Sequence, residues 1–419
     1  MQQKQQVWFL EDWVVEKSSS KLDFDSIKNI LTLRYKPTKN SLIPKKTWKD
    51  FVEKPSDTSS QIIENLICSN INTKIKNSTH TKTSIALSSG VDSTLVLALL
   101  KKTCPDVKIN AISIRFENSV DESKHAAKIA SKFDIDHNVV YIENYLRELP
   151  RAISIIKQPF WDLHWYYVVK KAKTLGKFLV SGDGGDELFG GYTFRYKKFL
   201  SLTTKNSTPI DKVKAYLQCH ERDWVEDQKD IFGQKLDFNW NHIYKQFLPY
   251  FDNPLNRLSQ VFLADFNGKL LYNWIPLNTS FHSYFGVKPI TPLLSKETIQ
   301  HTTHLPINLK YNLKADTGKL LLREILHKYS LDKLLIKKKQ GFSVDTINLW
   351  KSYGYDLCDC YLSDARIVQS KWINRDWIQK HFDKNNIDIR YVNKFLGLLA
   401  LEIWYRIFVT KEMKPTTTL

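Results

Sequence analysis

The stretch that most constrains this chain is "TSIALSSGVDSTLVLALLKKT", residues 83–103, in which a polar segment separates two apolar runs. The first run has the length of a buried strand, and the second has the length and composition of an apolar helix. A strand that turns directly into a helix is the repeating unit of a parallel α/β sheet. The stretch therefore predicts an α/β fold.

The flanking sequence continues the alternation of strands and helices. Further strands are predicted at residues 108–116, 137–143 and 177–180, and helices at residues 59–77, 122–133 and 165–176, the last ending at Gly176. Such alternation predicts a doubly wound parallel sheet, whose ligands bind at the carboxyl ends of its strands.

The rest of the chain has a different character. From Phe199 onward the pattern is largely helical, with predicted helices at residues 211–228, 319–329 and 393–408. Residues 1–60 show no sustained periodicity. We therefore expect a small N-terminal segment, residues 1–60, and a main domain, residues 61–419, with helical additions from about residue 199.

Composition excludes several classes of protein. Of the 419 residues 42% are hydrophobic, yet no uncharged apolar run approaches the roughly 20 residues of a membrane helix. The N-terminal "MQQKQQVWFLEDWVVEK" lacks the pattern of a signal peptide. Five scattered cysteines argue against a disulfide framework. We expect a cytoplasmic protein.

The net charge of +18 is spread along the chain. A lysine-rich solvated surface is the ordinary interpretation, and a polyanionic partner such as RNA is the alternative. No common nucleic-acid-binding motif accompanies the charge, so we regard a nucleic-acid partner as the minority interpretation.

The polar segment Ser88–Ser93 is predicted to hold an anion. It enters a helix N-terminus, where backbone N–H groups are free and the helix dipole is positive. The serine hydroxyls add donors, and Gly90 lets the backbone approach a phosphate. Asp92 would repel a bare phosphate, so its presence predicts a bridging magnesium ion. The alternative is an ordinary strand-to-helix turn with a serine cap.

A second polar segment, "SGDGGDELFGGY" at residues 181–192, holds five glycines and three carboxylates. This density of glycine indicates close approach of the backbone to a ligand or positive φ angles. From the neighbouring strand end Asp186 can supply a second magnesium ligand, and Asp183 can accept a proton. A calcium-like or purely structural turn is the alternative interpretation.

Together the two segments resemble a known family. "SSGVDS" resembles the SGG-x-D-S pyrophosphate loop of the ATP pyrophosphatases, and "SGDGGDELFGGY" is similar to the signature of the synthetase domain of asparagine synthetases. Three weaker stretches agree with the resemblance: "QPFWD" at 158–162, "KLLLREI" with "KKKQGFSV" at 319–344, and "LALEIWYRIF" near the end. The resemblance covers roughly residues 60–409 and implies an adenine nucleotide alpha hydrolase-like fold.

The resemblance also implies roles for individual residues. Asp92 and Asp186 would share Mg²⁺, Lys339 would stabilise the departing pyrophosphate of ATP, and Asp183 would be the base for an incoming amine. The ATP-binding residues that the resemblance implies are Ser88, Ser89, Gly90, Asp92 and Ser93 for the phosphates, and Leu87, Ile114, Ser181 and Gly182 for adenosine. The implied reaction activates a carboxylate as an acyl-adenylate and transfers the acyl group to an amine or ammonia.

Two departures from the family narrow this expectation. Residue 2 is Gln where glutamine-hydrolysing members expose a catalytic cysteine, so nitrogen is expected as free ammonia, from a separate partner, or as an amine on the substrate. "LTLRYKPTKNSLIPKKTW" looks like a remnant of the glutaminase domain.

The second departure lies in the acceptor segment, which reads Lys288-Pro-Ile-Thr-Pro-Leu-Leu-Ser295 where asparagine synthetases have Glu-Ala-Arg-Val-Pro-Phe-Leu-Asp. We therefore expect a carboxylate other than free aspartate, on a peptide or another natural-product precursor, with a carrier protein as a possible partner. The candidate pocket residues are Trp161, Asp162 and Lys288, with Trp165 and Trp274 as further walls. The alternatives are an ammonia-dependent asparagine synthetase, a tRNA-modifying ATP pyrophosphatase and a catalytically idle binding subunit.

Overall fold

A five-stranded sheet organises the computed structural model, which describes residues 23–37, 41–54, 58–76, 82–117, 119–335 and 344–419. The strands are β1 (Lys82–Ala86), β2 (Lys108–Phe116), β3 (Asp136–Ile142), β4 (Phe178–Val180) and β5 (Lys288–Ile290). Their order is β3-β2-β1-β4-β5, and each neighbouring pair is parallel. The predicted doubly wound sheet is confirmed. Its order reverses between β1 and β4, where such sheets form a ligand-binding crevice.

The helices of the sheet half follow the predicted pattern closely. They are α2 (Ser60–Lys76), α3 (Val91–Thr103), α4 (Ser123–Lys132), α5 (Leu149–Ile156) and α6 (His164–Leu175). In α3 every side chain from Val91 to Leu100 is buried, because this helix is apolar on all faces and is covered on all of them. Most of β2 is buried as well, as expected of a parallel strand covered on both faces.

Helices make up most of the second half. They are α7 (Gly185–Phe189), α8 (Thr193–Leu202), α9 (Pro209–Gln218), α10 (Trp240–Phe251), α13 (Lys296–Thr303), α14 (Leu320–Lys328), α15 (Thr346–Leu349), α16 (Tyr355–Leu362), α17 (Arg366–Gln369), α18 (Arg375–His381) and α19 (Ile389–Phe408). The helix predicted at 211–228 ends at Gln218. The sequence pattern also missed β5, a three-residue edge strand that contains Pro289, which edge strands tolerate.

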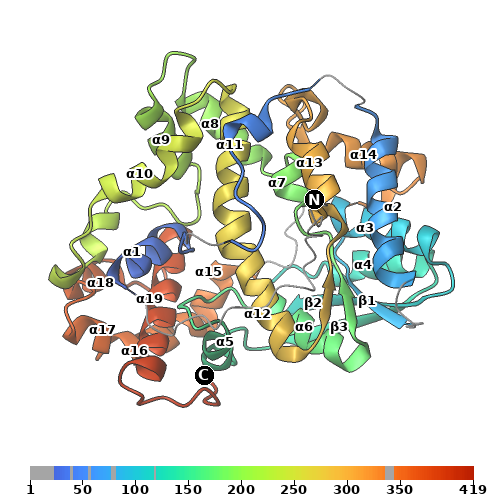
Figure 1. Ribbon diagram of the computed structural model, residues 1–419. Helices are drawn as coiled ribbons and strands as arrows, with labels where there is room; N and C mark the ends of the chain where they lie inside the picture. The colour runs from blue at the N-terminus through green and yellow to red at the C-terminus, as the bar shows by residue number, and fades with distance from the viewer. Residues whose placement is uncertain (1–22, 38–40, 55–57, 77–81, 118, 336–343) are drawn as a thin grey trace, which may run out of the picture.

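One long helical stretch runs through the middle of the molecule in Figure 1, with α8 to α10 on one side and α13, α14 and the sheet on the other. It consists of α11 (Arg257–Asp265), a π-helical segment η5 (Phe266–Trp274) and α12 (Ile275–Phe285), without a break between them. π-Helical turns are rare and often occur at functional sites. The N-terminal α1 (Phe24–Leu33) packs against α19, so the start of the described chain contacts its end.

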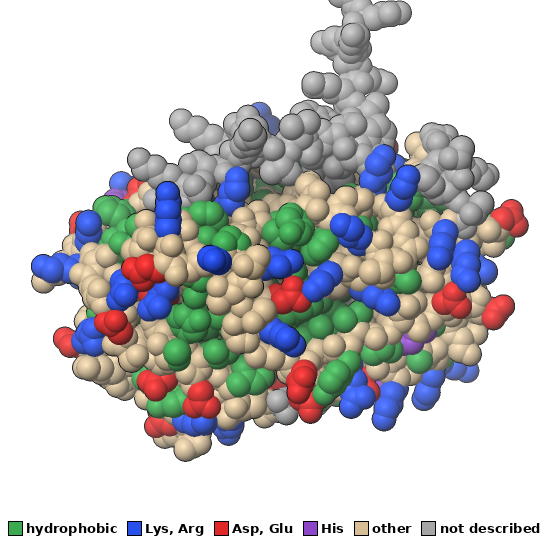
Figure 2. Space-filling view, turned by 90° about the horizontal axis from the view of Figure 1, so that it is seen from below, with side chains coloured by type: hydrophobic (Ala, Val, Ile, Leu, Met, Phe, Trp, Pro, Cys, Tyr) green, Lys and Arg blue, Asp and Glu red, His purple; other side chains and the backbone are tan. Residues whose placement is uncertain are grey.

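Apolar side chains from both halves form one continuous core. On the face shown in Figure 2, lysine and arginine side chains are interleaved with aspartate and glutamate rather than gathered in one basic stripe. No helix in the described part of the chain has the length and apolar character to cross a bilayer.

Candidate active site

The first polar segment forms the turn between β1 and α3. Gly90 is the N-cap of α3. The Ser93 hydroxyl donates a hydrogen bond to the carbonyl oxygen of Ser88 at 3.0 Å, and the Ser88 N–H donates to Ser93 Oγ at 3.2 Å. These bonds fix the turn so that Ser88, Asp92 and Ser93 line a cavity at the carboxyl ends of the strands. The N-terminal end of α3 is thereby available to an anion.

The second polar segment lies directly against the first. A Cβ atom on Gly182 would lie 2.7 Å from Cβ of Asp92, and one on Gly185 would lie 2.3 Å from Asp92 Oδ1. Gly184, with a φ of 91°, adopts a left-handed conformation that glycine accepts most readily. Contact with the β1–α3 turn therefore explains Gly182 and Gly185, and the positive φ angle explains Gly184.

Lys319 joins the two carboxylates that were predicted to share a metal. Its Nζ atom lies 2.5 Å from Asp92 Oδ2 and 2.5 Å from Asp186 Oδ1. Burial alone would lower the pKa of Lys319, but the Asp186 and Asp92 carboxylates outweigh it and raise that pKa above its ordinary value. Sequence reasoning noted the stretch that begins at Lys319 but gave this residue no role.

The residues around Asp92 fit a magnesium ion. The buried Oδ1 atom of Asp92 has no hydrogen-bond partner among the described residues. Magnesium is commonly held by one or two carboxylates together with substrate phosphates, so Asp92 and Asp186 are a sufficient protein contribution. Within the described ranges, no group of three or more His, Cys, Asp or Glu side chains could hold a metal by itself.

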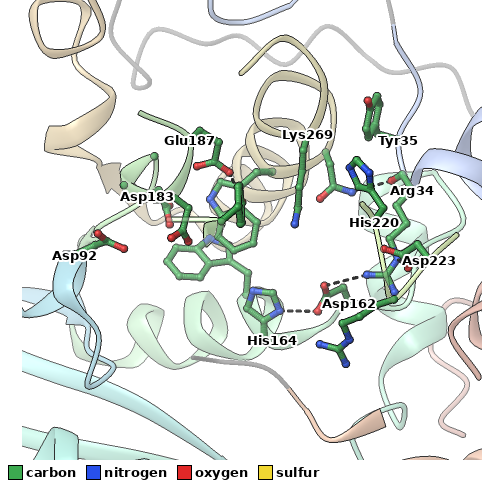
Figure 3. Close-up of a pocket in the computed structure, with 18 of the residues that line it drawn as sticks. Arg34, Tyr35, Asp92, Asp162, His164, Asp183, Glu187, His220, Asp223 and Lys269 are labelled. Atoms are coloured by element: carbon green, nitrogen blue, oxygen red, sulfur yellow. Dashed lines mark hydrogen bonds and ion pairs between the residues drawn. The ribbon is translucent and has the colours of Figure 1, made fainter. Parts of the chain in front are cut away.

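A cavity of about 400 Å³ opens from the two polar segments. This volume is within the usual range of small-molecule sites, about 300–1,000 Å³. Figure 3 shows that its labelled side chains come from both halves of the chain and converge on one space. The cavity brings together these predicted residues: Ser88, Asp92, Ser93, Trp161, Asp162, Trp165, Ser181, Gly182, Asp183, Asp186 and Trp274.

Asp183 lies in a tightly bonded environment. Its Oδ2 atom accepts hydrogen bonds from the Ser181 hydroxyl at 2.8 Å and the Asn278 amide at 3.3 Å. Burial raises the pKa of Asp183 to about 6, although hydrogen bonding to Ser181 and Trp274 opposes that shift. A carboxyl group that titrates near pH 6 is a candidate for proton transfer.

The π-helical segment forms one wall of the cavity with Lys269, Asn273 and Trp274. In a π-helix the hydrogen bonds join residues five apart, so these three side chains can share one face. Figure 3 shows Lys269 extending into the cavity. Burial and the nearby Arg195 guanidinium lower the pKa of Lys269. No carboxylate of the described residues lies within ion-pair distance of Lys269, so this cation is free to meet an anionic group.

The N-terminal segment supplies a neighbouring part of the lining, where the Asn273 amide donates a hydrogen bond to the Arg34 carbonyl oxygen at 2.8 Å. Arg34, which follows α1, lines the cavity with Tyr35. Its Nε atom lies 2.8 Å from Asp223 Oδ1, and its guanidinium lies 4.6 Å from the centre of the Trp161 ring. Sequence reasoning noted the stretch that contains Arg34 but gave this residue no role, because only tertiary folding brings it to the cavity.

Several predicted residues lie outside the cavity lining. Leu87, Ser89, Gly90 and Ile114 are buried behind it. Lys288 is exposed at the first position of β5, with its Nζ atom 6.0 Å from the centre of the Phe178 ring. Because the strands are parallel, that position is at the end of the sheet opposite the carboxyl ends of the strands, and Lys288 is not among the residues that line this cavity. Lys339 lies outside the described residues.

Comparisons with known proteins agree with this geometry. Residues 74–406 match the asparagine synthase family, which is most of the chain. The chain belongs to the asparagine synthase family. It is 24% identical to asparagine synthetase [glutamine-hydrolyzing] 1 of Bacillus subtilis over 367 residues, which are 78% of this chain and 56% of that protein. It is 32% identical to a putative asparagine synthetase [glutamine-hydrolyzing] of Mycobacterium bovis over 370 residues, 78% of this chain and 55% of that one.

This asparagine synthase family member therefore spans about half the length of the curated relatives it matches. Among solved structures, NMN synthetase from Francisella tularensis matches 51% of this chain and 94% of its own, with 16% identity and a TM-score of 0.27. The family match includes every described cavity residue except those of the N-terminal segment, Leu33, Arg34 and Tyr35.

Proposed function

We propose that the protein is an ATP-dependent, AMP-forming ligase that makes an amide from a carboxylate and an amine or ammonia. The observation that carries the proposal is the meeting of the Ser88–Ser93 turn, the Ser181–Asp186 turn and Lys319 at the reversal point of the sheet. Free N–H groups, hydroxyls, a buried cation and two carboxylates suit the triphosphate of ATP.

The reaction follows from these groups. A carboxylate oxygen of the substrate attacks the α-phosphorus of ATP, and the bond between that phosphorus and the bridging oxygen of pyrophosphate breaks. Ser88, Ser93 and the N-terminus of α3 bind the phosphates, while Lys319 offsets the charge that develops on the leaving pyrophosphate. Magnesium, when held by Asp92 and Asp186, would supply further positive charge to the phosphate oxygens. The amine then displaces AMP from the acyl carbon.

We further propose that the acceptor is not free aspartate. The segment Lys288–Ser295, which departs from the asparagine synthetase pattern, supplies no residue to the lining of this cavity. In addition, most charged side chains of the cavity are already paired within the protein. Arg34 pairs with Asp223, and the buried Arg195 pairs with Asp265. The aromatic side chains of Trp161, Trp165 and Trp274 suit a larger carboxylate, such as one on a peptide or other natural-product precursor.

A pyrophosphate-release screen tests the proposal. Purified protein is supplied with ATP, magnesium, candidate carboxylates and amines, with and without RNA, and the adduct is identified by mass. We expect pyrophosphate release that requires both a carboxylate and Asp92, so that Asp92→Asn abolishes it. Efficient amidation of aspartate with ammonium would refute the proposed acceptor class, and a modified tRNA would refute the proposed ligase.

A further inference from the structure

Asp162 and His164 form an ordered pair on the wall of the cavity. His164 Nδ1 lies 2.7 Å from Asp162 Oδ1, as the dashed line in Figure 3 shows. The Tyr145 hydroxyl donates to Asp162 Oδ1 at 3.1 Å and also accepts the backbone N–H of His164 at 3.1 Å. Carboxylate, imidazole and backbone are thus fixed relative to one another.

The charge of Asp162 determines which nitrogen of His164 is available. Burial opposes ionisation of Asp162, but the His164 imidazole and the Arg34 guanidinium outweigh it and hold the pKa of Asp162 well below its ordinary value. An ionised carboxylate accepts the hydrogen of Nδ1, which leaves Nε2 of a neutral imidazole with a free lone pair. Nε2 has no hydrogen-bond partner among the described residues, and His164 is 9% exposed at the cavity.

The ring of His164 is also held in place by an aromatic contact in the cavity wall. It stacks on Trp274 with 5.4 Å between ring centres and 22° between planes. Hydrogen bonding connects Trp274 in turn with Asp183, on the turn that follows β4. Trp274 therefore connects the imidazole with the turn that follows β4, one of the two turns to which the proposed function assigns ATP.

Asp183 is less suited to remove a proton from the amine. Its carboxylate already accepts hydrogen bonds from Ser181 and Asn278, and it also bonds with Trp274. A base needs a lone pair directed at the substrate. Asp183 uses three of its roughly four lone-pair positions to hold Ser181, Trp274 and Asn278, whereas the exposed nitrogen of His164 makes no such contact within the described part of the chain.

We propose that His164 is the general base of the amide-forming step and that Asp162 is its positioning residue. As the amine nitrogen bonds to the acyl carbon, a proton passes from that nitrogen to Nε2 of His164. The bond between the acyl carbon and the AMP oxygen then breaks, and AMP leaves as the anion. Asp162 stabilises the imidazolium that forms. This inference rests on the proposed ligase function and replaces the expectation that Asp183 is the base.

The test separates the two half-reactions for a carboxylate that the pyrophosphate screen identifies. Hydroxylamine is uncharged at neutral pH and traps an acyl-adenylate with little help from a base, so hydroxamate formation reports the first step. Amide formation from the amine reports both steps. For His164→Gln we expect hydroxamate formation within about threefold of the unmodified protein and amide formation lower by about 10²–10⁴-fold, the usual contribution of a general base.

Further variants exclude a merely structural role. Imidazole added to His164→Ala should restore part of the amide formation, and Asp162→Glu should retain more of it than Asp162→Asn. Asp183→Asn should lower amide and hydroxamate formation together. Equal loss of both products in His164→Gln, or unchanged amide formation, would overturn the inference while leaving the proposed function intact. Absence of pyrophosphate release by the unmodified protein would overturn both.

Discussion

The Nζ atom of Lys319 lies 2.5 Å from Oδ2 of Asp92, although 227 positions separate the two residues in the chain. The same atom lies 2.5 Å from Oδ1 of Asp186. One cation thus connects the turn after β1 with the turn after β4. The two carboxylates that were expected to bind magnesium are held together by this lysine before any nucleotide binds.

Replacing Lys319 should make the stability of the protein depend on magnesium. In Lys319→Met the buried Asp92 carboxylate loses its counterion, which typically costs about 3–5 kcal/mol. We expect a lower melting temperature in EDTA and partial recovery in millimolar magnesium chloride. The exposed Lys288→Met is the matched control and should melt like the unmodified protein. If the melting temperature of Lys319→Met is the same in EDTA and in magnesium chloride, the result would argue against a metal site at Asp92 and Asp186.

Adding one methyl group at Gly185 should impair nucleotide use. In Gly185→Ala the new Cβ would lie 2.3 Å from Asp92 Oδ1, so the turn or the carboxylate must move. A displacement near 1 Å in a reacting site can cost about 10²-fold in rate. We expect a loss of that order in pyrophosphate release. The control is Gly397→Ala, on helix α19. Its Cβ atom would lie at an ordinary contact distance of 3.8 Å from Leu31, so the rate of pyrophosphate release should be unchanged.

The stability contributed by Asp183 should fall as the pH rises. Its pKa in the folded protein is raised from an ordinary 3.8 to about 6, so the folded state binds more protons between these values. The contribution of Asp183 to the free energy of unfolding is therefore greatest below about pH 4 and is lost as the pH rises through about 6. Relative to Asp183→Asn, the unfolding free energy of the unmodified protein should drop by about 2 kcal/mol from pH 4 to pH 7. Urea unfolding of both proteins across this range measures the difference, and parallel curves would contradict the assignment.

Arg34 should affect the acceptor rather than ATP. Arg34→Met removes the ion pair with Asp223 and the guanidinium over Trp161, on the acceptor side of the cavity. Because Arg34 is partly exposed, the loss of stability should stay within about 1 kcal/mol. We expect a higher KM for the carboxylate with the KM for ATP unchanged. Arg366→Met, which removes an arginine paired with Asp364 and Glu412, should change neither constant.

The parts of this structure that sequence reasoning predicted are those that local patterns encode. Strands β1 to β4 and helix α3 stand out as short apolar runs bounded by polar residues, and the two polar turns after β1 and β4 follow from the topology of parallel sheets. Lys319 was missed as a partner of Asp92 because only tertiary folding brings them together. Arg34 was missed for the same reason, since it lies far in the chain from the other residues of the cavity. The strand β5, at whose first position Lys288 lies, was missed because this short strand contains a proline and has too few residues to show a pattern.

The π-helical segment Phe266–Trp274 has a consequence for how the acceptor preference of such a chain can change. Deleting one residue there would let the stretch relax toward α-helical geometry, and each residue of an α-helix advances the side chains by about 100°. If the deleted residue lay between them, Lys269 and Trp274 would be four residues apart and would stay on one face of the helix. The wide π-helical turn between them would close, while every side chain in the ATP-binding turns stayed the same. A change in the length of this segment, without any substitution in the ATP-binding turns, could thus change which carboxylate the cavity accepts.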